Sequence, residues 1–133
     1  MTRSTKLAAG LSAEVQTVVG QEHSAPHLGS GDVAVLATPA MVALVERACA
    51  QLVEPYLADS ETTVGVELHV KHIAPTPIGV TVKVLADLTA VKDDRLRFEA
   101  VIQDEKELVG RIDHERIIID RDRFMRRVEA KRS

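Results

Sequence analysis

The sequence predicts an α+β fold in which a curved antiparallel β-sheet wraps around one long central helix. Residues 38–57 carry the one convincing helical pattern, and its apolar face is wide. After this helix the chain alternates apolar and polar residues in four segments that are joined mostly by tight turns. Since a single helix cannot cover both faces of a five-stranded antiparallel sheet, we expect the sheet to curve around it.

The bulk composition indicates one soluble domain. The chain has 133 residues, and we expect residues 1–9 and about 121–133 to be terminal tails. It is 45% hydrophobic but only 2% aromatic, with a net charge of −3, which gives no case for binding nucleic acid. No apolar run reaches the roughly 18–20 residues that a membrane span needs, and the N-terminus lacks the apolar core of a secretory signal. Because the single cysteine, Cys49, cannot form an internal disulfide, we expect a cytoplasmic protein.

The region before the helix is predicted to hold one strand and one long loop. Residues 10–20, GLSAEVQTVVG, alternate as a strand does. Residues 21–37 are rich in Gly, Ser, Pro and His with weak periodicity, so we expect a loop whose length suits a lid. Since no aromatic residue lies between Val19 and Thr38, nothing indicates a lid that closes a small pocket with rings.

The helix is expected to begin at Thr38, a favourable N-cap residue. Pro39 suits the first helical position, where its missing N–H costs nothing. At about 100° per residue, one face is apolar. Its members are Met41, Val45, Ala48, Cys49, Leu52 and Tyr56. A face this wide predicts a helix that packs deeply against a sheet.

Four strands are expected after the helix, with a basic segment at the end of the chain. The strand-like segments cover residues 63–73, 80–91, 96–104 and 108–120. Residues 121–133 form either a short basic helix or a frayed tail, which either solubilises the protein or attracts polyanionic ligands. One long helix held in a curved antiparallel sheet is the hotdog fold, and we expect dimerisation to protect remaining surface or a sheet edge.

His72 is the first candidate for chemistry. In the strand of residues 63–73, alternate positions are Val64, Val66, Leu68 and Val70, so the apolar row ends in an imidazole. His72 is therefore a surface residue, a satisfied core histidine or a working group at the edge of a pocket.

Glu46 is the acidic residue of the helix that borders the apolar face. It can point into the helix–sheet interface together with His72, although the sequence does not establish that the two meet. A buried carboxylate needs a partner, whereas the simpler interpretation pairs Glu46 with Arg47 or another surface charge.

Thr38 and Gly65 each have a structural and a functional interpretation. Thr38 is either a plain N-cap or part of a helix N-terminus whose free N–H groups and dipole stabilise a developing oxyanion. Gly65 lies within a strand, where glycine indicates either a bulge or a close approach to the backbone.

The chain resembles the fluoroacetyl-CoA thioesterase-like family of hotdog-fold thioesterases over roughly residues 10–128. The segments that carry the likeness are LATPAMVALVERACAQLVEPYL, TTVGVELHVKHIAPTPIG and GRIDHERIIID, in this order and spacing. The resemblance implies a catalytic set of Thr38, Glu46 and His72. It also matches Gly65 to the strand glycine of the family, and His114, Glu115 and Arg116 to its His-Glu-Arg motif. Arg116 then contacts a substrate phosphate or forms a structural ion pair.

The implied activity is hydrolysis of an acyl-CoA, expected to be short-chain, by a homodimer or higher homo-oligomer without cofactor or metal. Glu46 is the expected general base or nucleophile, His72 polarises or protonates, Thr38 orients the attacking group or attacks itself, and Gly65 offers an oxyanion donor. The sequence leaves open whether an acyl-enzyme forms. Two other interpretations are a non-catalytic acyl-CoA-binding module and a dimer that binds no ligand.

Overall fold

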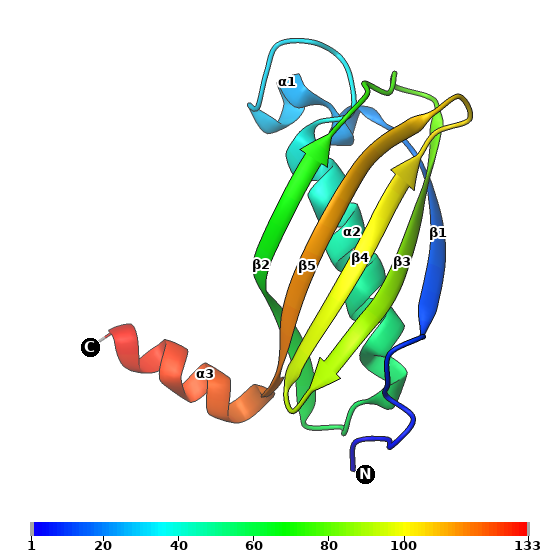
Figure 1. The fold of residues 1–133 in the computed structure, drawn as a ribbon. Coiled ribbons are helices and arrows are strands. Elements are labelled where there is room, and N and C mark those ends of the chain that lie inside the picture. The colour runs from blue at the N-terminus through cyan, green and yellow to red at the C-terminus, as the bar shows by residue number, and fades with distance from the viewer. Residues whose placement is uncertain (1, 133) are drawn as a thin grey trace.

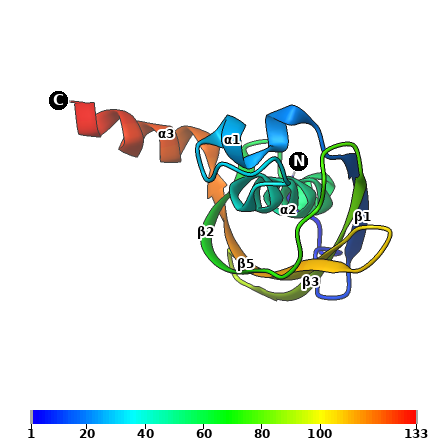
Figure 2. The ribbon, with the colours of Figure 1, turned by 90° about the horizontal axis from the view of Figure 1, so that it is seen from above.

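The computed structural model describes residues 2–132 and has one five-stranded antiparallel sheet around a central helix (Figure 1). The strands are β1 (Ser12–Val18), β2 (Glu61–His72), β3 (Thr81–Lys92), β4 (Arg95–Gln103) and β5 (Leu108–Asp120), in the spatial order β1-β3-β4-β5-β2. Helix α2 (Thr38–Val53) continues into a 3₁₀ turn, η2 (Glu54–Tyr56). Seen from above, the sheet curls around α2 (Figure 2). The predicted α+β class and hotdog fold are confirmed.

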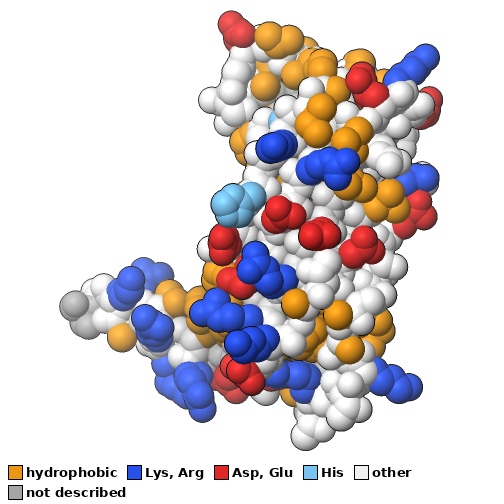
Figure 3. Space-filling view, viewed as in Figure 1, with side chains coloured by type: hydrophobic (Ala, Val, Ile, Leu, Met, Phe, Trp, Pro, Cys, Tyr) orange, Lys and Arg blue, Asp and Glu red, His pale blue; other side chains and the backbone are white. Residues whose placement is uncertain are grey.

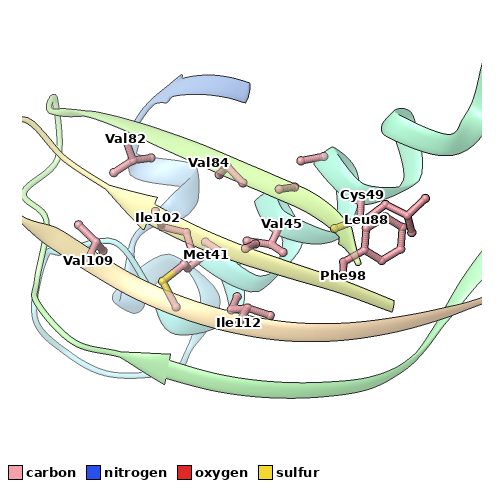
Figure 4. Packing of buried hydrophobic residues seen from close by; sticks show 14 of the residues in the cluster. Met41, Val45, Cys49, Val82, Val84, Leu88, Phe98, Ile102, Val109 and Ile112 are labelled. Carbon is pink, nitrogen blue, oxygen red and sulfur yellow. The ribbon is translucent and has the colours of Figure 1, made fainter. Parts of the chain in front are cut away.

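The core fills the space between α2 and the inner face of the sheet. Met41, Val45 and Cys49 project from α2 toward the strands (Figure 4). Facing them are the fully buried side chains of Val82, Val84, Leu88, Phe98, Ile102 and Ile112. Each such side chain contributes about 1.5–3 kcal/mol by leaving water. The predicted helix face is buried at Met41, Val45, Ala48 and Cys49, but Val53 replaces Leu52 and Tyr56, which are only half-buried.

A β-bulge changes which side chains of β2 face the helix. The register of β2 against β5 shifts between Gly65 and Glu67, so the alternation reverses there. Before the bulge, Thr63 and Gly65 are paired with Ile118 and Arg116, which share the inward phase of β5. The inward placement predicted for Val64 is therefore wrong.

Beyond the bulge, the predicted phase of β2 holds but the predicted burial does not. Val70 and His72 lie opposite Ile112 and Gly110 on the inner face. Val66 and Leu68 remain 49% and 37% exposed because β2 is an edge strand, which pairs with β5 on one side and with no other strand of residues 2–132.

The predicted loop of residues 21–37 contains two short helical turns. These are η1 (Gln21–His23) and α1 (Ala25–Leu28). Ser24 caps α1 by accepting a hydrogen bond from the His27 N–H, and Gly29 ends it in the left-handed conformation, with φ of 70°. The segment lies at the N-terminal end of α2 (Figure 1), where the Ala37 N–H donates to the His23 carbonyl.

Both ends of the chain are more ordered than expected of tails. Near the N-terminus, Arg3 pairs with Glu61 at 2.6 Å, and the Leu7 side chain is buried. At the C-terminus, helix α3 (Arg121–Glu129) is followed by a 3₁₀ turn, η3 (Ala130–Arg132). The Asp120 side chain caps α3 by accepting from the Arg123 N–H at 3.0 Å. Of the two forms considered for this segment, the structure has the short basic helix.

Candidate active site

Thr38 is not the N-cap of α2. Ala37 occupies that position, and no side-chain capping hydrogen bond is made there. Thr38 is the first residue of the helix, and its Oγ1 lies 2.7 Å from Nδ1 of His72 at the end of β2. The N-cap interpretation is thus wrong, because the hydroxyl is used by the imidazole. The exposed Thr38 side chain leaves this contact open to solvent.

His72 is half-buried and has one ring nitrogen free. Burial lowers the pKa of His72, and an interaction with the backbone of Ala74 offsets this only in part. The ring is therefore neutral at pH 7, and its Nδ1 accepts a hydrogen bond when the Thr38 hydroxyl donates. Among residues 2–132 the buried Nε2 has no hydrogen-bond partner. A buried polar atom without a partner is uncommon and calls for an explanation, such as a water or a ligand group that the site admits.

Gly110 allows α2 to approach the sheet beside His72. The two residues are directly opposite each other in the β2–β5 pair. A Cβ on Gly110 would lie 2.7 Å from Sδ of Met41 and 2.9 Å from the Lys71 carbonyl oxygen. The Met41 side chain occupies the space that a Cβ at position 110 would need, so only glycine fits at that position. The sequence analysis did not identify Gly110, although a glycine inside a strand is a recognised signal of close approach.

Glu46 belongs to a second group of polar side chains farther along α2. Its Oε2 lies 3.4 Å from Nη1 of Arg116 and 4.0 Å from Nε2 of His114. The Arg116 guanidinium is held in place by Thr63. Its Nε donates to Thr63 Oγ1 at 2.8 Å, and its Nη2 donates to the Thr63 carbonyl oxygen at 3.1 Å. Burial lowers the pKa of Arg116, and Glu46 raises it, but an arginine remains charged. A fixed positive charge therefore faces the carboxylate.

His114 is neutral and oriented by hydrogen bonds at both ring nitrogens. Its Nδ1–H donates to the Glu67 carbonyl oxygen at 2.9 Å, and its Nε2 accepts from Arg116 Nη1 at 3.1 Å. The side chain is fully buried against Phe98, with 6.1 Å between ring centroids. Burial is the largest cause of its lowered pKa, and the charge of Arg116 lowers it further.

Gly65 is required beside this group because any side chain would collide with it. A Cβ on Gly65 would lie 2.6 Å from Glu46 Oε2 and 3.0 Å from His114 Cε1. The bulge and the close approach, which the sequence presented as alternatives, are both present.

The predicted catalytic residues fall into two separate groups within one chain. Thr38 and His72 are in contact, whereas Glu46 follows Thr38 by eight residues, or about 12 Å along the helix axis. Over residues 2–132, no hydrogen bond or ion pair joins Glu46 to Thr38 or His72. The catalytic role of all three remains a prediction. Thr63, which the sequence analysis did not identify, is hidden by the bulge that reverses the strand phase.

A sheet wrapped around α2, with a hydroxyl–imidazole pair where the helix begins, defines a hotdog-fold protein with an enzyme-like site. A model of the fluoroacetyl-CoA-specific thioesterase family matches residues 19–122. The chain belongs to this family, so the predicted membership is confirmed. The fluoroacetyl-CoA thioesterase of Streptantibioticus cattleyicolor is 38% identical over 97 residues, which are 73% of this chain and 70% of that protein.

Solved structures agree with this assignment. A structure of a fluoroacetyl-CoA thioesterase has a TM-score of 0.89 at 32% identity, covering 92% of this chain and 96% of its own. A thioesterase superfamily member from Thermus thermophilus has a TM-score of 0.85 at 25% identity, with 96% of each chain covered.

Two features expected of other protein classes are not found in the described residues. No group of three or more His, Cys, Asp or Glu side chains between residues 2 and 132 is placed to hold a metal ion. No helix in the same range is long and apolar enough to cross a membrane.

Proposed function

We propose that this protein hydrolyses a short-chain acyl-CoA to the free acid and CoA, using Thr38 and His72 as its reactive pair. The 2.7 Å contact between Thr38 Oγ1 and His72 Nδ1 carries the proposal. A hydroxyl within hydrogen-bond reach of a neutral imidazole is the arrangement of a nucleophile with its base. Membership of a thioesterase family supports the same reaction class.

The chemistry needs an activated oxygen nucleophile and a stabilised oxyanion. His72 accepts a proton from the Thr38 hydroxyl, or from a water that Thr38 orients, as the oxygen attacks the thioester carbonyl carbon. Collapse of the tetrahedral intermediate breaks the C–S bond, and the proton passes from the imidazolium to the thiolate of CoA. If Thr38 attacks, a water then repeats the sequence on the acyl ester and returns the hydroxyl.

Glu46 as base or nucleophile and Gly65 as oxyanion donor remain proposals, whereas the contacts of Arg116 favour one of its two predicted roles. Arg116 and His114 hold the Glu46 carboxylate against the backbone of Gly65, which supports a polar role for this group. The inward Arg116 guanidinium, bonded to Thr63 and Glu46, favours the structural ion pair over contact with a substrate phosphate. Glu46→Gln tests whether the carboxylate is needed as base or nucleophile.

The proposed substrate is a short acyl-CoA without fluorine. The Streptantibioticus cattleyicolor relative is named for fluoroacetyl-CoA, but residues 20–37 of this chain contain no aromatic ring to close over a small acyl group. Cytoplasmic location is likewise part of the proposal and is supported by the single buried cysteine.

A homodimer formed through β2 is the proposed assembly. β2 is a 12-residue edge strand whose exposed side chains include Val66 and Leu68. An unpaired edge of this length is a template for pairing with another strand. The other edge, β1, has seven residues and exposes mostly polar side chains.

Release of CoA thiol from acyl-CoAs of increasing chain length, with fluoroacetyl-CoA included, tests the proposal. We expect turnover that is greatest for short unfluorinated chains and is lost in Thr38→Ala and His72→Ala. Thr89→Ala is the matched control, because Thr89 is exposed on β3, away from the Thr38–His72 pair and from the β2 edge. Tight binding of acyl-CoA without turnover would replace the proposal with the non-catalytic binding module.

A further inference from the structure

Helix α3 projects from the body of the protein, and its first residue is tied to the rest of the chain by a hydrogen bond from the Arg121 N–H to the Ser60 carbonyl oxygen at 2.8 Å. Figures 1 and 2 show it leaving the end of β5 and extending away from the sheet on the side of β2. None of its nine residues is buried. Isolated helices shorter than about 12–15 residues are marginal in water, so contacts with a further surface would stabilise α3.

The side chains of α3 form an apolar stripe with basic flanks. Phe124 and Val128 are four residues apart and share one face, where they line a groove with Arg127 and Lys131. Phe124 is half-buried, whereas Val128 and the neighbouring Met125 are 38% and 45% exposed. Figure 3 shows this helix as a projection in which hydrophobic side chains lie among dense Lys and Arg. An exposed apolar stripe on a projecting helix is typical of a docking surface.

Charge separates the C-terminal helical segment from the rest of the protein. Residues 121–132 contain six basic and two acidic side chains and so carry +4, which leaves −7 on the remainder to give the net −3 of the chain. A carboxylate row crosses the outer face of the sheet, where Glu99 lies opposite both Asp87 and Asp113 (Figure 3). The end of another copy that α3 is proposed to reach is acidic as well, because residues 21–37 contain Glu22 and Asp32 but no Lys or Arg, and so it complements this helix electrostatically.

The open edge of β2 lies on the same side as α3. Asp120, which caps α3, is paired with Glu61 at the start of β2. A lipid surface can cover an apolar helix face but cannot satisfy the N–H and C=O groups of a strand edge. One further copy of this chain can do both, because a two-fold interface covers the same surfaces on both partners.

We infer that α3 is an arm that docks on a second copy of this chain, an inference that rests on the proposed homodimer through β2. Antiparallel pairing of β2 with its symmetry mate places each Glu61 end beside the partner's His72 end. The arm, which begins at Arg121 after Asp120 and therefore beside Glu61, then reaches the partner's Thr38–His72 site. The Thr38–His72 pair of the chain that carries the arm is about 36 Å away along β2. The family match ends at residue 122, so almost all of α3 lies outside the segment that defines the family.

A photo-crosslinking experiment tests the arm directly. Val128→Cys is labelled with a maleimide–benzophenone, and Val18→Cys, 59% exposed on the opposite sheet edge, is the control. The native Cys49 does not interfere, because it is fully buried and burial raises the pKa of its thiol to about 12. We expect a covalent dimer from the Val128 probe alone, with adducts in residues 21–37 or 73–79 of the second copy.

Sedimentation equilibrium of the unlabelled protein distinguishes docking of α3 on a second copy from formation of the homodimer through β2. We expect a dimer whose dissociation constant rises at least about tenfold in Phe124→Asp, which loses an apolar anchor. A wild-type dimer with no interchain adduct from Val128 would overturn the arm but keep the dimer. A monomeric wild type would overturn both, and binding of α3 to anionic vesicles without interchain adducts would reassign it to a membrane surface.

Discussion

The two polar groups beside α2 differ in how completely their hydrogen bonds are satisfied. Thr38 and His72 make one contact with each other, and His72 Nε2 is left without a partner among the described residues. Arg116 and His114, by contrast, are bonded on several sides and buried. A satisfied network is rigid and specifies one arrangement, whereas an unsatisfied pair retains capacity for a ligand. This contrast supports the proposal that Thr38 and His72 react, whereas Arg116 and His114 hold Glu46 in place.

The largest expected effect is the loss of activity on removing the open pair. Thr38→Ala and His72→Ala are each expected to lower kcat/KM by about 10²–10⁴-fold, the usual contribution of a positioned acid–base group. Thr38 is exposed and His72 half-buried, so urea unfolding should change by less than about 1 kcal/mol. Thr38→Ser, which keeps the hydroxyl, should retain most of the activity. If Thr38→Ala and His72→Ala lowered the free energy of unfolding as strongly as Arg116→Leu does, the two polar groups would not differ in role.

Removing the centre of the satisfied group should instead destabilise the fold. Arg116→Leu leaves His114 Nε2 and Glu46 without their donor and is expected to lower the free energy of unfolding by about 2–3 kcal/mol. Glu46 is 38% exposed, which keeps the value below that of a fully buried pair. Arg111→Leu, an exposed change in the same strand, should stay within about 0.5 kcal/mol. Urea denaturation of the wild type, Arg116→Leu and Arg111→Leu measures both changes in the free energy of unfolding.

Gly65→Ala should destabilise the protein through a collision rather than a lost bond. The new methyl group would meet Glu46 Oε2 at 2.6 Å, and overpacking of this kind typically costs about 1–3 kcal/mol. Since the collision involves Glu46, the double variant Gly65→Ala/Glu46→Ala should recover part of the loss. Strictly additive free energies of unfolding would show that the two residues do not meet.

The pH dependence gives the smallest expected effect. Because the pKa of His72 is lowered, its neutral form persists as the pH falls through its ordinary value of about 6.5. The acid limb of kcat/KM should therefore lie below pH 6.5. An acid limb above that value would assign the titration to a different group.

The lowered pKa of His114 has a corresponding consequence for stability. The unfolded chain binds the proton more readily than the folded chain, so neutral His114 stabilises the fold fully above about pH 6.5. This stability is lost as the pH falls from there through the folded-state pKa. The urea midpoint should consequently fall less between pH 7.5 and 5.5 in His114→Gln than in the wild type.

Sequence patterns predicted the helix, the strands and the inward direction of His72, but they did not predict the contact between Thr38 and His72. The inward phase of His72 was predictable because the bulge at Gly65 lies before it, whereas Val64, on the other side of the bulge, was placed wrongly. A bulge depends on the pairing with β5 and leaves only a glycine as its trace. The same phase change hid Thr63 from the sequence analysis.

Strand order and the surroundings of α3 were also beyond the sequence. Val66 and Leu68 alternate as core residues do, and only the edge position of β2 explains their exposure. The Thr38 ambiguity had a similar origin, since one residue type serves both as a cap and as a reactive hydroxyl. Only the position of His72 in space distinguishes the two roles.

A double-mutant cycle on kcat/KM for the preferred acyl-CoA tests the central claim most directly. If Thr38 and His72 act as one reactive pair, Thr38→Ala/His72→Ala should lose no more activity than either single variant, because each change already disables the pair. Losses that multiply in the double variant would show that the two residues act independently and would contradict the assignment of their contact as the reactive pair.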